Sequence, residues 1–353
     1  MAYTGINKAS DHFASTAYTG NQSARTITLG MQPDFVWTKC RNSAHNHIWT
    51  DSLTGAGKRQ TSNGSPPAAQ DTSGASVASF TSTGYTLTDN STINGNSENN
   101  VVFAWKAGAG TTSNNTNGTW ASTVSANQAA GFSTCTFTPT AAAASWGHGL
   151  DKAPEMIFVR GYTGTNKWRI YHKKMGNGHY RDLNTQSDPE PNSNMWSATT
   201  PDATKCYQYG GQSGDAGQAH QAFHWTSKQG YSLIDSYYGN GNADGQFVYC
   251  GFKPAFVFIF WIDSGDGYDY IMYSPKIPTV NSASVTTNPL TNIVEANTTD
   301  TENTNANFKL DFLSNGFKCR GTESNINSYD KQYAFYAVGQ SLVGTNNVIG
   351  TAR

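Results

Sequence analysis

One short phrase occurs three times along this chain and limits its fold more than any other feature. Each copy contains a proline (Pro33, Pro154 or Pro254) that is followed by a nearly continuous run of bulky apolar residues. Such a run is typical of a β-strand buried on both faces. Proline is tolerated at the first residue of such a strand, where no ladder donor is needed. The chain is therefore predicted to contain three related units.

A short aromatic segment follows each phrase by about ten residues, and each pair is predicted to form a hairpin across a polar turn. These segments are residues 47–51, 168–172 and 270–273, and the turns are 41–45, 161–166 and 263–268. In the first and third units, a Gly-aromatic segment and a closing apolar strand come later at identical spacing, Gly84 to Phe103 and Gly316 to Phe335. The middle copy is less faithful and closes on residues 218–225. The opening strands are 13–21, 131–139 and 230–241.

These short strands with turn signals between them predict an all-β chain. We expect three tandem related antiparallel β-sandwich units of jelly-roll type, each with a small core of its own. The predicted boundaries are residues 10–108, 130–228 for a divergent second unit and 229–340, with a Gly/Thr/Ser/Asn linker at 109–129 and a C-terminal tail at 341–353.

The composition agrees with many short strands and long turns. Thr, Ser, Asn and Gly make up 143 of the 353 residues, while charged residues make up only 13%, against about 25% in ordinary soluble domains. The formal net charge of −1 argues against a nucleic-acid partner. The longest bulky apolar run, residues 255–262, is too short to span a membrane.

The first residues of the chain carry no signal-peptide pattern, which favours synthesis in a cytoplasm. The five cysteines are widely spaced and form no C-x-x-C motif, so we expect reduced, structural thiols.

Five motifs occur in order over residues 11–108: DHFASTAYTGN, GMQPDFVWTKCR, HIWTDSLTG, ASFTSTGYTL and VVFAWKAG. Together they resemble a repeat found in virion structural and tail-fibre-like proteins of marine tailed phages, cyanophages among them. DFLSNGFKC and YAFYAVG in the third unit are similar to the same repeat. The family's DSVRG element has become DSLTG at residues 51–55 and has lost its arginine. The resemblance implies a virion location more firmly than an activity, and it supplies no catalytic residues.

No catalytic constellation stands out in the sequence. A glycosidase needs two carboxylates across a cleft, and no local motif selects such a pair among the 24 acidic residues. The chain contains no G-x-S-x-G elbow, no P-loop lysine and no H-E-x-x-H motif. We therefore expect a protein that is not an enzyme and has no cofactor.

Two groups of residues are candidate metal ligands. Asp263, Asp266 and Asp269 form a weak calcium candidate, although an Asp-Gly hairpin turn explains the same residues and the EF-hand spacing is missing. Local hydrogen bonding is the favoured role of the histidines, with metal binding the less favoured one. The histidines considered are His45, His47, His172, His179, His220 and His224.

Aromatic side chains on loops are the favoured ligand-binding candidates. An exposed ring beside Asn, Asp or Gln is a common site for stacking a sugar, and residues 173–217 form the longest non-repeating loop. For several of these rings, burial in a core is the alternative. The candidate glycan-binding residues are Trp168, Tyr180, Trp196, Tyr207, Tyr209, Tyr237 and Tyr238.

Three functions stay open at this point. The favoured one is a tail or capsid appendage that contacts the host surface through glycans. The others are a purely structural capsid fibre, knob or tail-assembly component, and a polysaccharide depolymerase. Exposed sheet edges favour association with other virion proteins and a homo-oligomer, with a trimer preferred.

Overall fold

The computed structural model describes residues 4–64, 76–161, 166–263, 267–278 and 288–340. The described chain is built from antiparallel β-sheets, with two four-residue α-helices and two 3₁₀ turns. This confirms the all-β prediction. The predicted tail at 341–353 lies outside the described residues.

The first unit contains an inner sheet of order β1-β7-β3-β4 and an outer sheet of order β2-β6-β5. Its elements are η1 (Ala9–Asp11), β1 (Phe13–Thr19), β2 (Arg25–Thr28), β3 (Phe35–Cys40), β4 (Ile48–Asp51), β5 (Val77–Thr81), β6 (Gly84–Leu87), α1 (Ser91–Asn94) and β7 (Asn99–Trp105).

The second unit has an eight-stranded sheet of order β15-β14-β13-β12-β17-β10-β9-β8 and a small sheet of β11 and β16. Its strands are β8 (Ser113–Asn115), β9 (Ser122–Asn127), β10 (Phe132–Phe137), β11 (Ala143–Gly147), β12 (Met156–Gly161), β13 (Arg169–His172), β14 (His179–Asp182), β15 (Glu190–Pro191), β16 (Lys205–Tyr209) and β17 (His220–Trp225).

The third unit has an inner sheet of order β18-β25-β20-β21-β22 and an outer sheet of order β19-β24-β23. Its elements are β18 (Ser232–Tyr238), β19 (Phe247–Tyr249), β20 (Pro254–Trp261), β21 (Ile271–Tyr273), β22 (Val294–Glu295), η2 (Ala306–Phe308), β23 (Leu310–Leu313), β24 (Gly316–Cys319), α2 (Ser324–Asn327) and β25 (Gln332–Gly339).

The inner sheets repeat one strand order, as the sequence repeats suggest. The opening strand pairs with the closing strand, which pairs with the strand of the Pro phrase: β1-β7-β3, β10-β17-β12 and β18-β25-β20. The three predicted hairpins are confirmed as β3–β4, β12–β13 and β20–β21.

The segment 109–129, predicted to be a linker, differs from expectation. It contains β8 and β9, and β9 pairs with β10 over six residues. The Ser, Thr and Asn residues that suggested a linker instead add two strands to the inner sheet of the second unit, and β8 forms its edge.

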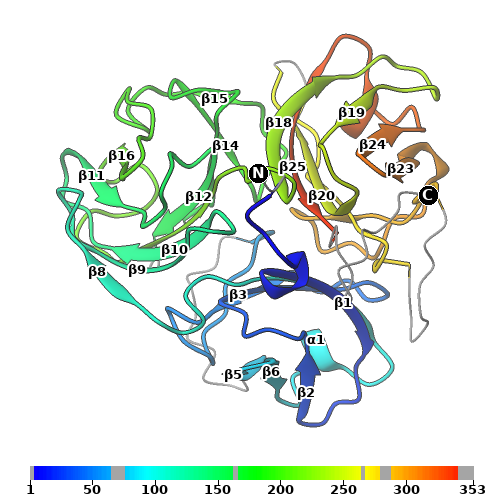
Figure 1. Cartoon of the computed structure of the whole chain (residues 1–353), viewed down its shortest axis with the longest axis horizontal. Coiled ribbons are helices and arrows are strands. Elements are labelled where there is room, and N and C mark those ends of the chain that lie inside the picture. The colour runs from blue at the N-terminus through cyan, green and yellow to red at the C-terminus, as the bar shows by residue number, and fades with distance from the viewer. Residues whose placement is uncertain (1–3, 65–75, 162–165, 264–266, 279–287, 341–353) are drawn as a thin grey trace.

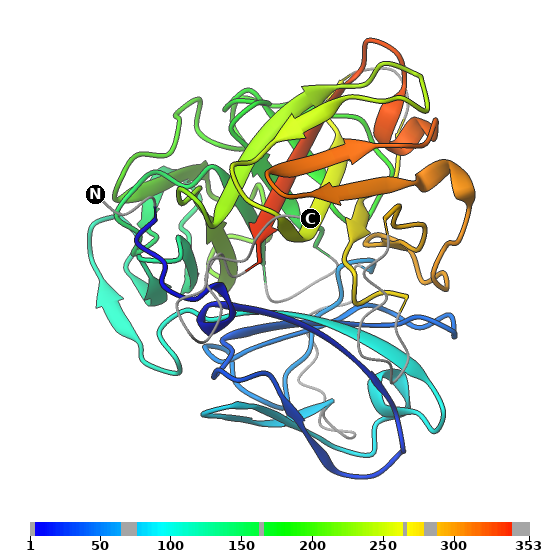
Figure 2. The ribbon, with the colours of Figure 1, turned by 45° about the vertical axis from the view of Figure 1, so that its right-hand side comes forward.

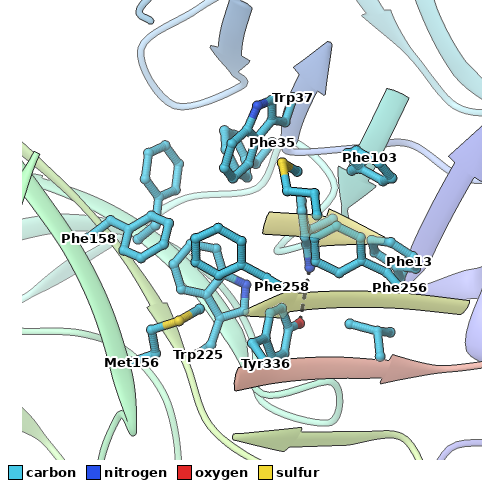
Figure 3. Close-up of a cluster of buried hydrophobic side chains, with 14 of the residues drawn as sticks. Phe13, Phe35, Trp37, Phe103, Met156, Phe158, Trp225, Phe256, Phe258 and Tyr336 are labelled. Atoms are coloured by element: carbon cyan, nitrogen blue, oxygen red, sulfur yellow. Dashed lines mark hydrogen bonds between the residues drawn. The ribbon is translucent and has the colours of Figure 1, made fainter. Parts of the chain in front are cut away.

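The three units lie as lobes around a common centre (Figure 1), and a second view keeps the first unit below the other two (Figure 2). Each inner sheet buries one face against that centre. In the strands after the prolines, alternate side chains enter the shared cluster (Figure 3): Phe35 and Trp37 from β3, Met156 and Phe158 from β12, and Phe256 and Phe258 from β20.

The intervening side chains of the same strands face outward. Val36, Ile157 and Val257 belong to three separate clusters beneath the outer sheets. Both faces of β3, β12 and β20 are therefore buried, which explains why their sequences are apolar without alternation. The expectation of three small cores was incomplete, because a fourth core joins the units.

Aromatic donors also connect the units pairwise. Trp105 Nε1 donates to Tyr336 Oη at 3.1 Å, Trp168 Nε1 donates to the Thr61 carbonyl at 3.1 Å, and Tyr270 Oη donates to the Asp182 carbonyl at 2.9 Å. Each pair of lobes thus shares a buried hydrogen bond that would be lost if they separated.

Candidate functional site

A groove of about 410 Å³ runs between two sheet edges of the third unit. One wall is β18, the edge strand of the inner sheet, and the other is β19, the edge strand of the outer sheet. The volume lies within the usual range for a small-molecule site, about 300–1,000 Å³.

Three exposed aromatic side chains line this groove. Tyr238, Phe247 and Tyr249 are 56%, 37% and 63% exposed. A fourth exposed aromatic residue, Tyr329, has its backbone and Cβ beside Gly241, in the turn that follows β18. Among the described residues, only one other large apolar side chain, Tyr209, is exposed to this degree, so the rings are concentrated at one place.

Strand geometry explains why these rings face solvent. Successive side chains of a strand point to opposite faces, and Val248 is buried between exposed Phe247 and Tyr249. Likewise Tyr237 is buried while Tyr238 is exposed. The apolar partners fix the register of both strands, and this holds the exposed rings in place.

Polar groups accompany the rings. The groove lining includes Asp235, Ser236 and Gln246. Asp235 Oδ1 lies 2.8 Å from Lys174 Nζ. Burial acts to raise the pKa of Asp235, but the Lys174 contact and the Ser236 N–H outweigh it and lower that pKa, so the carboxylate is ionised at neutral pH. It is the single carboxylate among the described groove residues.

The first unit repeats the frame of this groove. Tyr18 and Tyr237 each donate to the carbonyl of an isoleucine in a short helix, Ile93 and Ile326, at 2.5 and 2.7 Å. Thr19 therefore occupies the position of Tyr238.

The outer strands give a second alignment. Thr28 faces Gly84 in the first unit as Tyr249 faces Gly316 in the third. By the same register, Thr26 is the counterpart of Phe247. Three threonines thus stand where the third unit has its three groove aromatics.

Four of the seven predicted sugar-stacking residues are buried, which corrects their assignment. Trp168 and Trp196 are fully buried, and Tyr180 and Tyr237 are nearly so. Trp168 belongs to the central cluster, and Trp196 packs edge-on against Tyr171. The Arg169 guanidinium lies 4.6 Å from the Tyr180 ring centre, and Tyr180 Oη donates to Glu190 Oε2 at 2.7 Å.

The remaining three candidates lie at the surface in two places. Tyr207 and Tyr209 are both in β16, on the small sheet of the second unit. Tyr207 Oη donates to Asp202 Oδ2 at 2.5 Å, and Tyr209 is 41% exposed. Only Tyr238 lies in the groove. Phe247, Tyr249 and Tyr329 were missed, and alignment of residues 246–249 with residues 25–28 could have found the first two.

The calcium candidates lie partly outside the described residues. Asp266 lies outside the described residues. Asp269 Oδ1 accepts hydrogen bonds from Gln186 Nε2 at 2.7 Å and Asn297 Nδ2 at 2.8 Å. This carboxylate therefore already has two donors.

Most of the candidate histidines are buried. His47, His172, His220 and His224 are fully buried, and burial is the main cause that lowers their pKa, to about 3 for His172. His47 accepts from Trp37 Nε1, and His224 accepts from Trp146 Nε1, at 2.8 and 3.1 Å. Local hydrogen bonding thus accounts for these two, and His179 is exposed on β14.

A larger hollow of about 570 Å³ lies where the first two units meet. Residues from Lys106 to Ser113 form one side, and Val124 to Gln128 form the other. The wall is made of small side chains, amides, one lysine and one imidazole, with no phenyl, phenol or indole ring. The smaller aromatic groove therefore offers the stronger binding surface.

The chain belongs to a family described as a domain of unknown function, DUF7483, whose model matches residues 8–341. No curated protein matches the chain. Within the described residues, no helix has the length and apolar character needed to cross a membrane.

Proposed function

We propose that this chain is a non-enzymatic binding protein and that the groove between β18 and β19 holds a carbohydrate. The observation that carries the proposal is that three exposed aromatic residues, Tyr238, Phe247 and Tyr249, line one groove. Exposed aromatic rings lose little conformational entropy on binding and offer flat apolar faces to a sugar ring.

The groove chemistry suits a neutral or weakly charged glycan. Asp235, Ser236 and Gln246 can hydrogen-bond sugar hydroxyls, while the rings cover the apolar C–H faces. Glycoside hydrolysis generally requires two carboxylates about 5–10 Å apart, and Asp235 stands alone in the described lining. This favours binding over cleavage.

We further propose that the protein is a tail or capsid appendage of a tailed phage, built from three tandem sandwich units. The sequence resemblance over residues 11–108 supports this setting. In this role the chain forms a trimer and contacts other virion proteins. The groove then contacts glycans of the host surface.

The threonines of the first unit supply the test variants. Replacing Tyr238, Phe247 and Tyr249 by threonine installs residues that the equivalent strands already carry. Each substitution should weaken glycan binding about two- to twelvefold, because an aromatic contact contributes about 0.5–1.5 kcal/mol. The triple variant should lose binding on a glycan array and to whole host cells.

Tyr209→Thr is the matched control, since Tyr209 is equally aromatic and exposed but lies on the second unit. It should leave binding unchanged. Failure of the parent chain to bind any glycan or host cell would refute the adhesive role and favour a purely structural appendage. Release of reducing sugar from host polysaccharide would support the depolymerase alternative.

A further inference from the structure

Three side chains with different metal-binding atoms converge at one corner of the first unit. The ligand atoms of Cys40, His45 and Glu98 all lie within 4.8 Å of one another, and His45 Nε2 is 2.9 Å from Glu98 Oε1. Among the described residues this is the one such set of three.

Rigid elements place these residues. Cys40 is the last residue of β3, and Glu98 directly precedes β7, the strand that pairs with β3. His45 lies in the turn between β3 and β4. The Arg41 N–H donates to the Asn99 carbonyl at 2.7 Å, so the ends of the two strands are held together.

The Cys40 thiol is buried and donates a hydrogen bond to Asn42 Oδ1 at 3.5 Å. A cation of the zinc type would take the place of this thiol proton, because zinc binds cysteine as the thiolate.

The Glu98 carboxylate also has an oxygen atom without a hydrogen-bond donor in the described part of the chain. Its Oε2 is buried and has no hydrogen-bond partner among the described residues. A buried carboxylate oxygen without a donor costs free energy unless a cation compensates it.

The third unit has different residues at the equivalent strand ends. In the shared register Trp261 replaces Cys40 and Lys331 replaces Glu98, and Lys331 Nζ lies 5.4 Å from the Trp261 ring centre. A positive group thus bridges the strand ends in that copy. The first unit presents acidic and soft ligands at this place.

We propose that Cys40, His45 and Glu98 bind a divalent cation of the zinc type. Thiolate, imidazole and carboxylate together suit Zn²⁺, and a tetrahedral ion places sulfur and nitrogen ligands about 3.5 Å apart. Small side-chain rotations would bring the three atoms to that spacing. The fourth position is open to water, because His45 and Glu98 are 32% and 18% exposed.

The ion would clamp the β3–β4 turn to the start of β7. That turn also reaches the third unit, since Lys39 Nζ donates to the carbonyls of His45 and Thr299 at 2.9 and 3.0 Å. The Lys39 charge is thereby held on backbone oxygens at the turn. Binding should raise the thermal midpoint of the full chain.

The test is titration of the metal-free full chain with Zn²⁺ against a chromophoric chelator, and with Co²⁺ in an absorption cuvette. We expect one equivalent bound and a sulfur-to-cobalt charge-transfer band. Cys40→Ala should abolish the band, and Glu98→Gln should weaken Zn²⁺ binding at least about tenfold. Glu98→Gln is nearly isosteric and retains an acceptor for His45. This variant should therefore stay folded, so that weaker binding reports the loss of the carboxylate.

Cys250→Ala is the control, because Cys250 is a buried thiol of the third unit. It should keep both the band and the affinity. Absence of a charge-transfer band in the parent chain, or equal affinity in the parent, Cys40→Ala and Glu98→Gln proteins, would overturn the proposal.

Discussion

Phe35→Ala should destabilise two units at once. Phe35 is fully buried in β3 of the first unit, and its ring centre is 4.3 Å from that of Phe223 in β17 of the second. It also contacts Trp49 and Trp105 within its own unit, at 5.1 and 5.3 Å between ring centres. Removing it opens a cavity between the two inner sheets.

The magnitude follows from the burial. Truncating a buried Phe to Ala typically costs about 3–5 kcal/mol. At about 1.4 kcal/mol per factor of ten, amide exchange in the affected strands should accelerate about two to three and a half orders of magnitude.

Native-state hydrogen exchange by mass spectrometry measures this effect. In Phe35→Ala, exchange should accelerate in β3 and β7 and also in β10 and β17. Leu87→Ala is the comparison, since Leu87 is buried in the outer cluster of the first unit alone. Its effect should stay within the first unit. Unchanged exchange in β10 and β17 of Phe35→Ala would refute a shared central core.

Three further outcomes are expected. The free energy of unfolding in urea should fall as the pH drops from 7 to 5. Burial holds the pKa of His172 at about 3 in the folded chain, whereas the pKa of a histidine in the unfolded chain is near 6.5. Protonation of His172 between these values therefore favours the unfolded chain. His172 alone accounts for about 2 kcal/mol of lost stability at pH 5. His172→Gln should therefore reduce the dependence of the free energy of unfolding on pH, and an unchanged pH dependence would contradict this role of His172. All five cysteines are buried and free, and burial raises the pKa of Cys250 and Cys319 to about 12, so Ellman's reagent should react only after denaturation; rapid reaction of the native chain would argue against this packing. Asp34→Asn should cost about 3 kcal/mol, because the buried Asp34 carboxylate accepts the N–H groups of Ala107, Ala109 and Gly110 at 2.7–2.8 Å; a chemical-denaturation midpoint equal to that of the parent would refute that role.

The repeats carried most of the fold prediction. The Pro phrases located β3, β12 and β20, and their lack of alternation correctly indicated burial on both faces. They could not reveal what covers each face. A strand sandwiched in its own unit and a strand shared with two other units have the same apolar sequence, so the central core was visible only in three dimensions.

The binding residues were harder to predict for a related reason. Trp168 and Tyr238 are both aromatic residues near turns, and the sequence does not separate them. Their fates depend on neighbours distant in the chain: Trp168 enters the centre beside Trp49, with ring centres 4.7 Å apart, whereas Tyr238 ends an edge strand. The sequence identifies an aromatic side chain, but only the packing in three dimensions decides whether its ring is exposed to solvent.

The first and third units are built on the same arrangement of strands. Their frames agree down to the hydrogen bonds: the Asn21 N–H donates to Asn94 Oδ1, and the Asn240 N–H donates to Asn327 Oδ1, at 3.2 and 3.0 Å. Both copies therefore meet the requirements for folding. Residues at exposed positions can differ between the two copies without affecting these shared contacts. Threonines are replaced by aromatics along the groove, and a Cys–Glu corner is replaced by a Trp–Lys corner. The groove aromatics are exposed, so the groove is the place to seek a function particular to the third unit. At the strand ends, Trp261 packs in the outer cluster of the third unit, whereas His45 and Glu98 of the first unit stay partly exposed and are the place to seek a function of that unit.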